Sequence, residues 1–310
     1  MYSKIKIPSL SSRGICFLYI EHAKVSRVDF SLTITDEEGT VSVPIVQVCA
    51  VFLATGTSIT DKAMTMLGEL GVAAVWVGEG LVRCYSSVTG VTKSSRIATQ
   101  QAKLVSNTFL RAEVARKMYA MRFPDEDVSA LTIQQLRGRE GTRVKREYVK
   151  VAKEYGLSWS GRSSRMESIA EDDLPNQALT MATSALYGVS LAVISAIGAV
   201  PSLGFVHTGH ALSFVFDIAD LYKTSIALPT AFEIASSDLG INSLDSEIRK
   251  EMREIIHREK LVARIVEDIK TLLMLDDVEF SDSLYLWDES GDVVSGHTNW
   301  AFLEEEMMSP

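Results

Sequence analysis

The segment at residues 48–77, VCAVFLATGTSITDKAMTMLGELGVAAVWV, decides the fold of the N-terminal part. Its two ends, VCAVFLA at 48–54 and VAAVWV at 72–77, are rich in β-branched and aromatic residues and predict strands. Between them, the stretch at 59–70 has the period of a helix, which Gly71 ends. The apolar residues at helical spacing are Ala63, Met66, Leu67 and Leu70. The segment therefore predicts a sheet interrupted by one helix.

Further runs of the same composition lie on both sides of this segment. They are ICFLYI (15–20), KVSRVDFSLTI (24–34), TVSVPI (40–45) and LVRCYS (81–86). DEEG at 36–39 is typical of a hairpin turn. Residues 1–88 are therefore expected to form a small β-rich N-terminal domain.

The pattern changes after residue 88. Residues 89–95, TGVTKSS, are polar and without a period, which indicates a linker. From residue 96 onward apolar residues recur at three and four positions, as in the stripe of Leu110, Val114, Met118 and Met121. No alternating runs return before residue 275. We expect an α+β protein in which an all-α C-terminal catalytic domain, residues 96–275, follows the β-rich domain.

Size and composition are those of an intracellular globular protein. With 310 residues and 46% apolar residues, two domains can be filled. Cys16, Cys49 and Cys84 are odd in number and scattered, which favours a reducing compartment. The N-terminus lacks the apolar run of a secretory signal. The most apolar stretch, 179–203, contains serines, threonine, Gly198 and Pro201 and is expected to be a buried core helix. A cytoplasmic protein is expected.

The negative total charge hides a basic interior segment. The formal net charge is -9, yet residues 276–310 contain ten acids and no Lys or Arg, so the rest of the chain is close to neutral. Residues 137–165 carry nine basic residues against three glutamates. Such a run is often only a solvated helix face. Beside a catalytic site it would instead bind phosphates.

The stretch GFVHTGHALSFVFDIADLYK at 204–223 carries the clearest candidates for chemistry. Asp217 and Asp220 are three residues apart, which places both carboxylates on one face of a helix, at the edge of an apolar stripe. His207 lies in a glycine-flanked loop, and His210 is a second imidazole nearby. Carboxylates with one imidazole suit Mg²⁺ or Mn²⁺. A solvated acid pair and an ordinary loop histidine remain the alternative, and spacing does not decide between the two histidines.

A third acid, Glu140, lies inside QQLRGREGTRVKREYVKVAKEYG among basic residues. In one interpretation it forms ordinary ion pairs on a helix. In the other it is a metal ligand and the neighbouring cations clamp phosphates, as phosphoryl transfer requires. The sequence allows both.

Four segments together resemble a known family. LRGREGTRVKREY, NQALTMATSALYG, GFVHTGHALSFVFDIADLYK and PTAFEIA, with VWVGE at 75–79, are similar to the CRISPR adaptation integrases, the first of the numbered CRISPR-associated proteins, in their type I-E form. The resemblance extends to about residue 270. It implies a homodimer whose β-domain precedes a helical domain. It also implies metal ligands at Glu140, His207 and Asp220, with Asp217 as the adjoining catalytic acid.

The implied activity is integration of short duplex DNA into the CRISPR repeat array. A DNA 3′-hydroxyl attacks a phosphodiester in a transesterification that needs Mg²⁺ or Mn²⁺. The implied partners are double-stranded DNA and the small second CRISPR-associated adaptation protein. Expected DNA contacts are Arg83, Arg137, Arg139, Arg143, Arg146 and Lys223. His210 and Phe216 depart from the family's usual basic residue and tyrosine, which affects end recognition.

Two other functions fit the same residues. A nuclease that only hydrolyses DNA could use the same ligands, and a non-catalytic DNA-binding scaffold would make the acids and His207 incidental. The acidic tail at 276–310 contains Trp287 and Trp300. It is expected either to be disordered or to order on a partner, for which the aromatics would be anchors.

Overall fold

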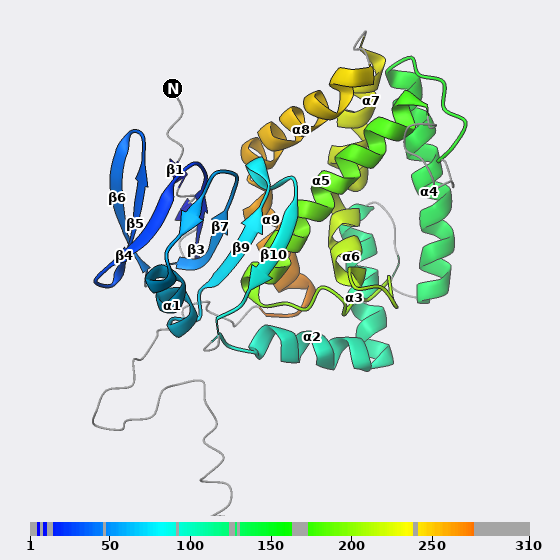
Figure 1. Cartoon of the computed structure of the whole chain (residues 1–310). Helices are drawn as coiled ribbons and strands as arrows, with labels where there is room; N and C mark the ends of the chain where they lie inside the picture. Colours follow the sequence, from blue (N-terminus) through cyan, green and yellow to red (C-terminus); the bar gives the residue numbers. More distant parts are fainter. Residues whose placement is uncertain are drawn as a thin grey trace, which may run out of the picture.

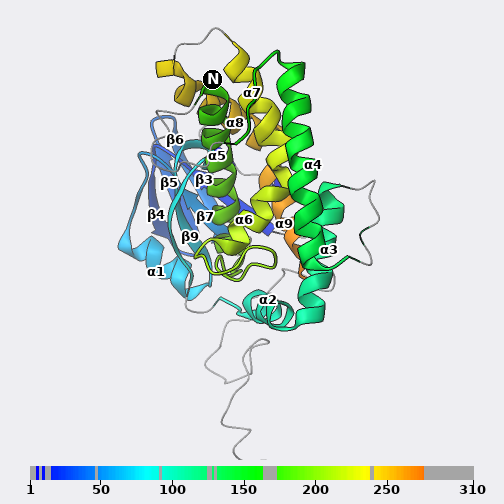
Figure 2. The ribbon, with the colours of Figure 1, turned by 90° about the vertical axis from the view of Figure 1, so that its right-hand side faces the viewer.

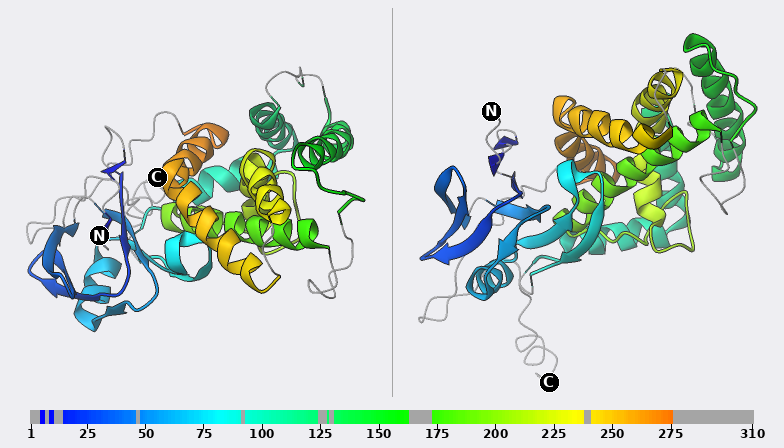
Figure 3. Two further views of the ribbon diagram at one scale, coloured as in Figure 1. Left: turned by 90° about the horizontal axis from the view of Figure 1, so that it is seen from above. Right: turned by 45° about the horizontal axis from the view of Figure 1, so that its top comes forward.

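The computed structural model confirms the α+β class, with strands at one side of the molecule and helices at the other (Figure 1). It describes residues 15–45, 48–90, 93–123, 131–162, 173–237 and 241–275, with the short pieces 5–6, 9–10 and residue 128. Seen from above, the strands and the green helices of the middle of the chain lie at opposite ends (Figure 3). The acidic tail lies outside the described residues.

The N-terminal part holds two sheets and one helix. The strands are β1 (Ile5–Lys6), β2 (Ser9–Leu10), β3 (Ile15–Ile20), β4 (Lys24–Val28), β5 (Ser31–Asp36), β6 (Gly39–Pro44), β7 (Val48–Leu53), β8 (Ser58–Ile59), β9 (Ala73–Val77) and β10 (Cys84–Val88). The helix α1 spans Asp61–Glu69, and a short 3₁₀ turn, η2, spans Glu79–Leu81. One sheet has the order β1-β3-β7-β9-β10 with β2 also paired to β3, and the other has the order β6-β5-β4-β8.

The larger sheet is covered on both faces, which explains its nearly continuous apolar strands. Strands β3, β7 and β9 are parallel neighbours. In β7, Ala50 and Phe52 pack toward the helices, whereas Val51 and Leu53 pack toward α1 and the second sheet. Side chains of a strand alternate between faces, so both sets are buried.

One predicted strand divides in two. KVSRVDFSLTI forms β4 and β5, which pair Val28 with Ser31 around a tight turn. Asp29 in this turn has a positive φ of 52°, a conformation that Asp tolerates better than most residues. The apolar pattern alone does not show this turn, because Phe30 continues the pattern. In the structure Phe30 is 66% exposed.

The remaining chain forms helices around a central one. They are α2 (Arg96–Ser106), α3 (Thr108–Arg122), α4 (Ile133–Glu154), α5 (Leu174–Ile197), α6 (Ser213–Tyr222), the π-helical η4 (Lys223–Ala227), α7 (Leu228–Ser236), α8 (Ile241–Arg258) and α9 (Leu261–Leu272). Figures 1 and 2 show α5 between the larger sheet and the other helices. It contacts β7, β9 and β10 as well as α6, α7, α8 and α9.

Helix α5 joins the two halves into a single core. The Asp173 side chain caps its start by accepting from Asn176 N at 2.9 Å, and Gly198 ends it with a left-handed φ of 81°. A Cβ at Gly188 would lie 2.5 Å from Val82 O, so the helix rests directly on the backbone before β10. Its mean hydropathy of 1.6 and length would suit a membrane span, but 72% of that window is buried by the protein itself, as in a core helix.

Candidate active site

The two acids of α6 are buried. Asp217 is 3% exposed and Asp220 is 8% exposed, beside Phe214 and Ile218 in the core. Both carboxylates were predicted at the edge of an apolar stripe, and the structure buries them there and does not leave them solvated. Because burying a carboxylate requires partners, each of the two acids has a specific one.

The loop between α5 and α6 brings His207 to these acids. Gln101, which is fully buried, donates to Val200 O at 3.0 Å and to Leu203 O at 2.9 Å. A Cβ at Gly204 would lie 2.4 Å from His207 O, so the tight fold of the loop requires glycine there. Gly209 has a φ of 81°. These contacts fix the direction from which His207 enters the site.

Asp217 organises this loop. Its Oδ2 accepts from the backbone N–H of Phe205 at 2.5 Å and of Val206 at 3.1 Å. Its Oδ1 accepts from His207 N at 2.9 Å and pairs with His207 Nδ1 at 2.8 Å. Both oxygens are thus occupied. Asp217, predicted as a catalytic acid, acts in this structure as a positioning residue.

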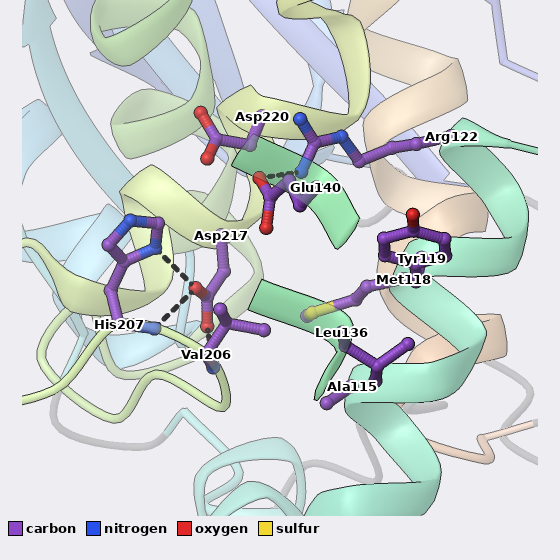
Figure 4. Close-up of a pocket in the computed structure, with 10 residues that line it drawn as sticks. All are labelled: Ala115, Met118, Tyr119, Arg122, Leu136, Glu140, Val206, His207, Asp217 and Asp220. Carbon is purple, nitrogen blue, oxygen red and sulfur yellow. Dashed lines mark hydrogen bonds and ion pairs between the residues drawn. The ribbon is translucent and has the colours of Figure 1, made fainter. Parts of the chain in front are cut away.

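The contact with Asp217 also settles how His207 faces the pocket (Figure 4). The hydrogen bond to Asp217 raises the pKa of His207, against the lowering effect of its partial burial. With Nδ1 directed at the carboxylate, Nε2 is the nitrogen left for another partner. His210 takes a different place: its Nδ1 accepts from Leu212 N at 3.0 Å. Of the two histidines, His207 therefore lines the acidic pocket.

Glu140 reaches the same pocket from α4. Thr132 begins this helix with a capping box to Gln135. Two turns further on, the Glu140 carboxylate forms a short ion pair with Arg122, the last residue of α3 (Figure 4). Glu140 thus forms an ion pair, as the first of the two interpretations of this residue predicts, and it also lines the pocket.

Asp220 has its own cation. Lys223, one turn later in the π-helical segment, contacts Asp220 Oδ1 as an ion pair. Burial lowers the pKa of Lys223, but the carboxylate outweighs this effect and the pKa is raised. No second hydrogen bond to Asp220 Oδ1 is found among the described residues, so the Lys223 ammonium is its one close partner there. π-Helical turns are frequent at functional sites.

All four acidic or imidazole candidates line one small cavity of about 20 Å³, together with Arg122 and apolar residues of α3 and α4. This volume suits a water molecule or a single ion. Over the described ranges, no three His, Cys, Asp or Glu side chains are close enough to hold a metal ion as they stand. Glu140 and Asp220 are instead each paired with a cation of the chain, Arg122 and Lys223.

A much larger groove, about 1140 Å³, adjoins this cavity and shares Glu140, Val206 and His207 with it. Its walls carry cations and aromatic rings: Lys145, Arg162, His210, Tyr148, Trp159 and Phe216. Arg162 is fixed by hydrogen bonds to Asn176 O at 3.2 Å and Thr180 Oγ1 at 2.9 Å. The ring of Phe216 contacts those of His210 and Tyr187 at centroid distances of 5.0 Å and 4.9 Å. A groove of this composition suits a polyanion that also carries rings.

The predicted DNA contacts are distributed around these two cavities. Arg139 and Arg146 are exposed on α4, and Arg143 lies over the Phe123 ring at 4.6 Å. Arg83 is exposed just before β10, and Lys223 is bound to Asp220. The side chain of Arg137 lies outside the described part of the chain. None of the five whose side chains are described lines the large groove; Lys145 and Arg162 do.

Several residues of the site were not predicted from the sequence as site residues. Arg122 ends an ordinary amphipathic helix, and no local pattern distinguishes it. Trp159 and Arg162 follow α4 in a segment without a period. The basic run at 137–165 was the only signal that included Lys145 and Arg162.

The chain is similar to known proteins over most of its length. Residues 17–126 match the family described as CRISPR associated protein Cas1. The chain is 45% identical over 284 residues to the CRISPR-associated endonuclease Cas1 of Clostridium sp. (strain SY8519), covering 91% of this chain and 94% of the relative. It is 36% identical over 267 residues to the protein of the same name from Escherichia coli (strain K12), covering 86% and 87%.

A solved structure gives the same result. The crystal structure of the TtCas1–DNA complex superposes with a TM-score of 0.79 at 39% identity, covering 85% of this chain and 98% of that one. The matched stretch covers 91% of this chain in the Clostridium relative and 86% in the Escherichia coli relative. The chain therefore belongs to the CRISPR-associated Cas1 family.

Proposed function

We propose that this chain is a divalent-cation-dependent DNA integrase of CRISPR adaptation, which joins the 3′-hydroxyl of a short duplex to a phosphodiester of the CRISPR repeat. The observation that carries the proposal is the shared pocket: Glu140, His207 and Asp220 come from three separate segments and line one cavity. That cavity adjoins a groove with cationic and aromatic walls. The relatives named as Cas1 endonucleases support a nuclease activity, and the TtCas1–DNA complex supports DNA as the substrate.

The residues fit Mg²⁺ or Mn²⁺ by their chemistry. Two carboxylates and one imidazole nitrogen are donors that such ions accept. Among the described residues Asp220 Oδ1 has only the Lys223 ammonium as a close partner, and a carboxylate oxygen can accept more than one, so it has room for a cation. Glu140, His207 through Nε2, and Asp220 would hold the ion. When bound, it would stabilise negative charge on the attacking and leaving oxygens of the phosphodiester.

The other residues of the site bind and orient. Asp217 holds the His207 ring and the backbone of its loop in one position. Lys145 and Arg162 would contact backbone phosphates along the groove, as cations on DNA-binding surfaces do. Trp159 and Phe216 present ring faces on which an unpaired base could stack. With a DNA hydroxyl as nucleophile, no side chain needs to become covalently attached to the strand.

The assembly follows the family resemblance. We propose a homodimer in the cytoplasm that works with the small second CRISPR-associated protein on double-stranded DNA. TtCas1 is known in complex with DNA, which supports a DNA partner for this chain. The tail at 276–310 is the proposed docking segment for the small protein, on its charge and aromatic content.

Strand joining tests the proposal. The full chain and the small partner are mixed with a labelled short duplex and a supercoiled plasmid that carries the repeat, in Mn²⁺ and in EDTA. We expect the label to join the plasmid only in Mn²⁺, and E140Q and D220N to lose joining by more than about a hundredfold. E113Q, an exposed acid paired with Lys117 on α3, should join as the wild type does.

A duplex whose 3′-ends lack the hydroxyl separates the competing functions. An integrase joins no label from this duplex, because the nucleophile is missing. Cleavage of the plasmid without any joining, in Mn²⁺, would identify a hydrolytic nuclease instead. Equal DNA binding without either reaction would identify a scaffold.

A further inference from the structure

Arg122 is an unusual residue for the place it occupies. Its side chain is only 7% exposed, and it lines the small cavity with Glu140, His207 and Asp220. The guanidinium forms an ion pair with Glu140, yet its Nε is buried without an acceptor. A buried guanidinium normally satisfies all its donors. This one has a donor to spare inside the site.

Lys223 repeats the arrangement on the other carboxylate. Its side chain is 20% exposed and contacts Asp220 Oδ1, while its ammonium also lies 5.8 Å from the Tyr187 ring centroid. Among the described residues no second donor reaches Asp220 Oδ1. Both carboxylates proposed to hold a divalent ion are therefore neutralised by cations of the chain itself, and the Arg122 pair also leaves Nε without an acceptor.

The unsatisfied Nε makes the Arg122–Glu140 pair poor as permanent structure. A buried ion pair offsets its desolvation only when its remaining donors and acceptors are satisfied. A phosphate oxygen would satisfy Arg122 Nε, since guanidinium groups match phosphate geometry. A divalent cation would compete with Lys223 for Asp220, so the two pairs together suit a metal ion and a DNA phosphate.

We propose that Arg122 and Lys223 are internal counter-cations, which hold Glu140 and Asp220 while no metal is bound and transfer to DNA phosphates when a divalent cation takes the carboxylates. The proposal rests on the metal-dependent function proposed above and assigns Arg122 a new role in it. Before metal binds, the two cations offset repulsion between the partly buried carboxylate of Glu140 and the buried one of Asp220. After metal binds, the same cations become free for the substrate.

Two consequences can be measured without turnover. Metal and DNA should each strengthen binding of the other, because each releases the groups that the other needs. Metal affinity in the absence of DNA should be reduced by the fraction of molecules in which the carboxylates are already paired. Both effects depend on Arg122 and Lys223 and not on overall charge.

The first measurement is Mn²⁺ affinity by titration calorimetry on the full chain without DNA. We expect R122M and K223M each to bind Mn²⁺ about tenfold more tightly than the wild type. This factor corresponds to a wild type in which about nine of ten metal-free molecules have the carboxylate paired with its cation. R122K, which retains a cation, should return to near wild-type affinity. K145M removes a positive charge from the neighbouring groove and should change the affinity by less than about twofold, since exposed charges are screened.

The second measurement is the affinity of the full chain for a short DNA duplex, in EDTA and in Ca²⁺. Binding in these two buffers is measured without relying on strand transfer. R122M should bind as the wild type does in EDTA and about tenfold more weakly in Ca²⁺, the loss of one charge-assisted contact. Should R122M lose affinity equally in both buffers, Arg122 would be a constant DNA contact and the transfer would be refuted.

The outcomes also separate this proposal from the one on which it rests. A wild-type protein that neither binds Mn²⁺ nor joins DNA overturns the proposed function, and the counter-cation role with it. A wild-type protein that does both, while R122M and K223M leave Mn²⁺ affinity unchanged, overturns the counter-cation role alone. If R122M does not fold, the Mn²⁺ affinity of K223M still tests the counter-cation role, because Lys223 pairs with a different carboxylate, Asp220.

Discussion

The exchange of Asp217 for Asn tests whether one buried carboxylate organises the site. The side chain of Asp217 is fully buried and accepts four contacts, two on each oxygen. Asn has the same shape but only one accepting oxygen, so two of the four donors lose their acceptor and meet an NH₂ group. Hydrogen bonds to a charged acceptor are worth roughly 1.5 to 3 kcal/mol each.

Two such losses should lower the free energy of unfolding of D217N by about 3 to 6 kcal/mol, a large share of the stability of an ordinary domain. Urea unfolding followed by tryptophan fluorescence measures it, since Trp76 and Trp159 lie in the folded part. D245N is the matched control: Asp245 forms an exposed ion pair with Arg249 on α8, and its loss should cost less than about 1 kcal/mol.

The same substitution should affect metal binding separately from stability. Without the carboxylate, the His207 ring loses the partner that fixes which nitrogen carries the proton, and changes of this kind typically weaken metal affinity 10- to 100-fold, about the range expected for Mn²⁺ here. The reasoning is refuted if D217N unfolds within about 0.5 kcal/mol of the wild type, because the four contacts would then contribute almost nothing.

Two further predictions concern the framework around the site. G188A should destabilise the chain by about 1 to 3 kcal/mol, because the new Cβ would lie 2.5 Å from Val82 O, whereas G138A on α4 meets open space and should stabilise slightly; urea unfolding of both compares them, and equal effects would contradict the close approach. Burial raises the pKa of Asp268, whose carboxylate accepts from the Tyr222 hydroxyl. The folded state therefore binds the carboxyl proton of Asp268 more tightly than the unfolded chain does. The resulting stabilisation of the fold is present at low pH and is lost as the pH rises from 3.8 through the folded pKa. The difference in unfolding free energy between wild type and D268N should therefore fall over that interval, and a difference independent of pH would refute it.

The sequence was sufficient wherever a pattern was local. The two acids of α6 are three residues apart, and a helix places them together whatever surrounds it. The glycine-flanked loop predicted the bend that carries His207, and Gly209 does adopt a positive φ. The helical period at 59–70 corresponds to α1, Asp61–Glu69. In these cases the chemistry of a few neighbouring residues determines the geometry.

The sequence was insufficient where distant segments meet. Arg122 pairs with Glu140 across two helices, and nothing near residue 122 indicates its partner. The burial of Asp217 depends on backbone N–H groups of a loop ten residues away, so its positioning role could not be separated from a catalytic one by spacing. The turn at Asp29 was missed because an exposed Phe30 continues the apolar pattern.

The position of α5 against the sheet has a consequence for how the chain is made. The helix-facing side of β7 and β9, with Phe52 and Val75, is buried only by α5 and its neighbours. Leu174 follows Val77 by 97 residues, and a ribosome adds about 5 to 20 residues each second. The nascent sheet therefore presents an apolar face for about 5 to 20 s before its cover is synthesised. During that interval a trigger-type chaperone has a binding surface, and a chain released early, with its strands complete, would be prone to aggregation in the cell.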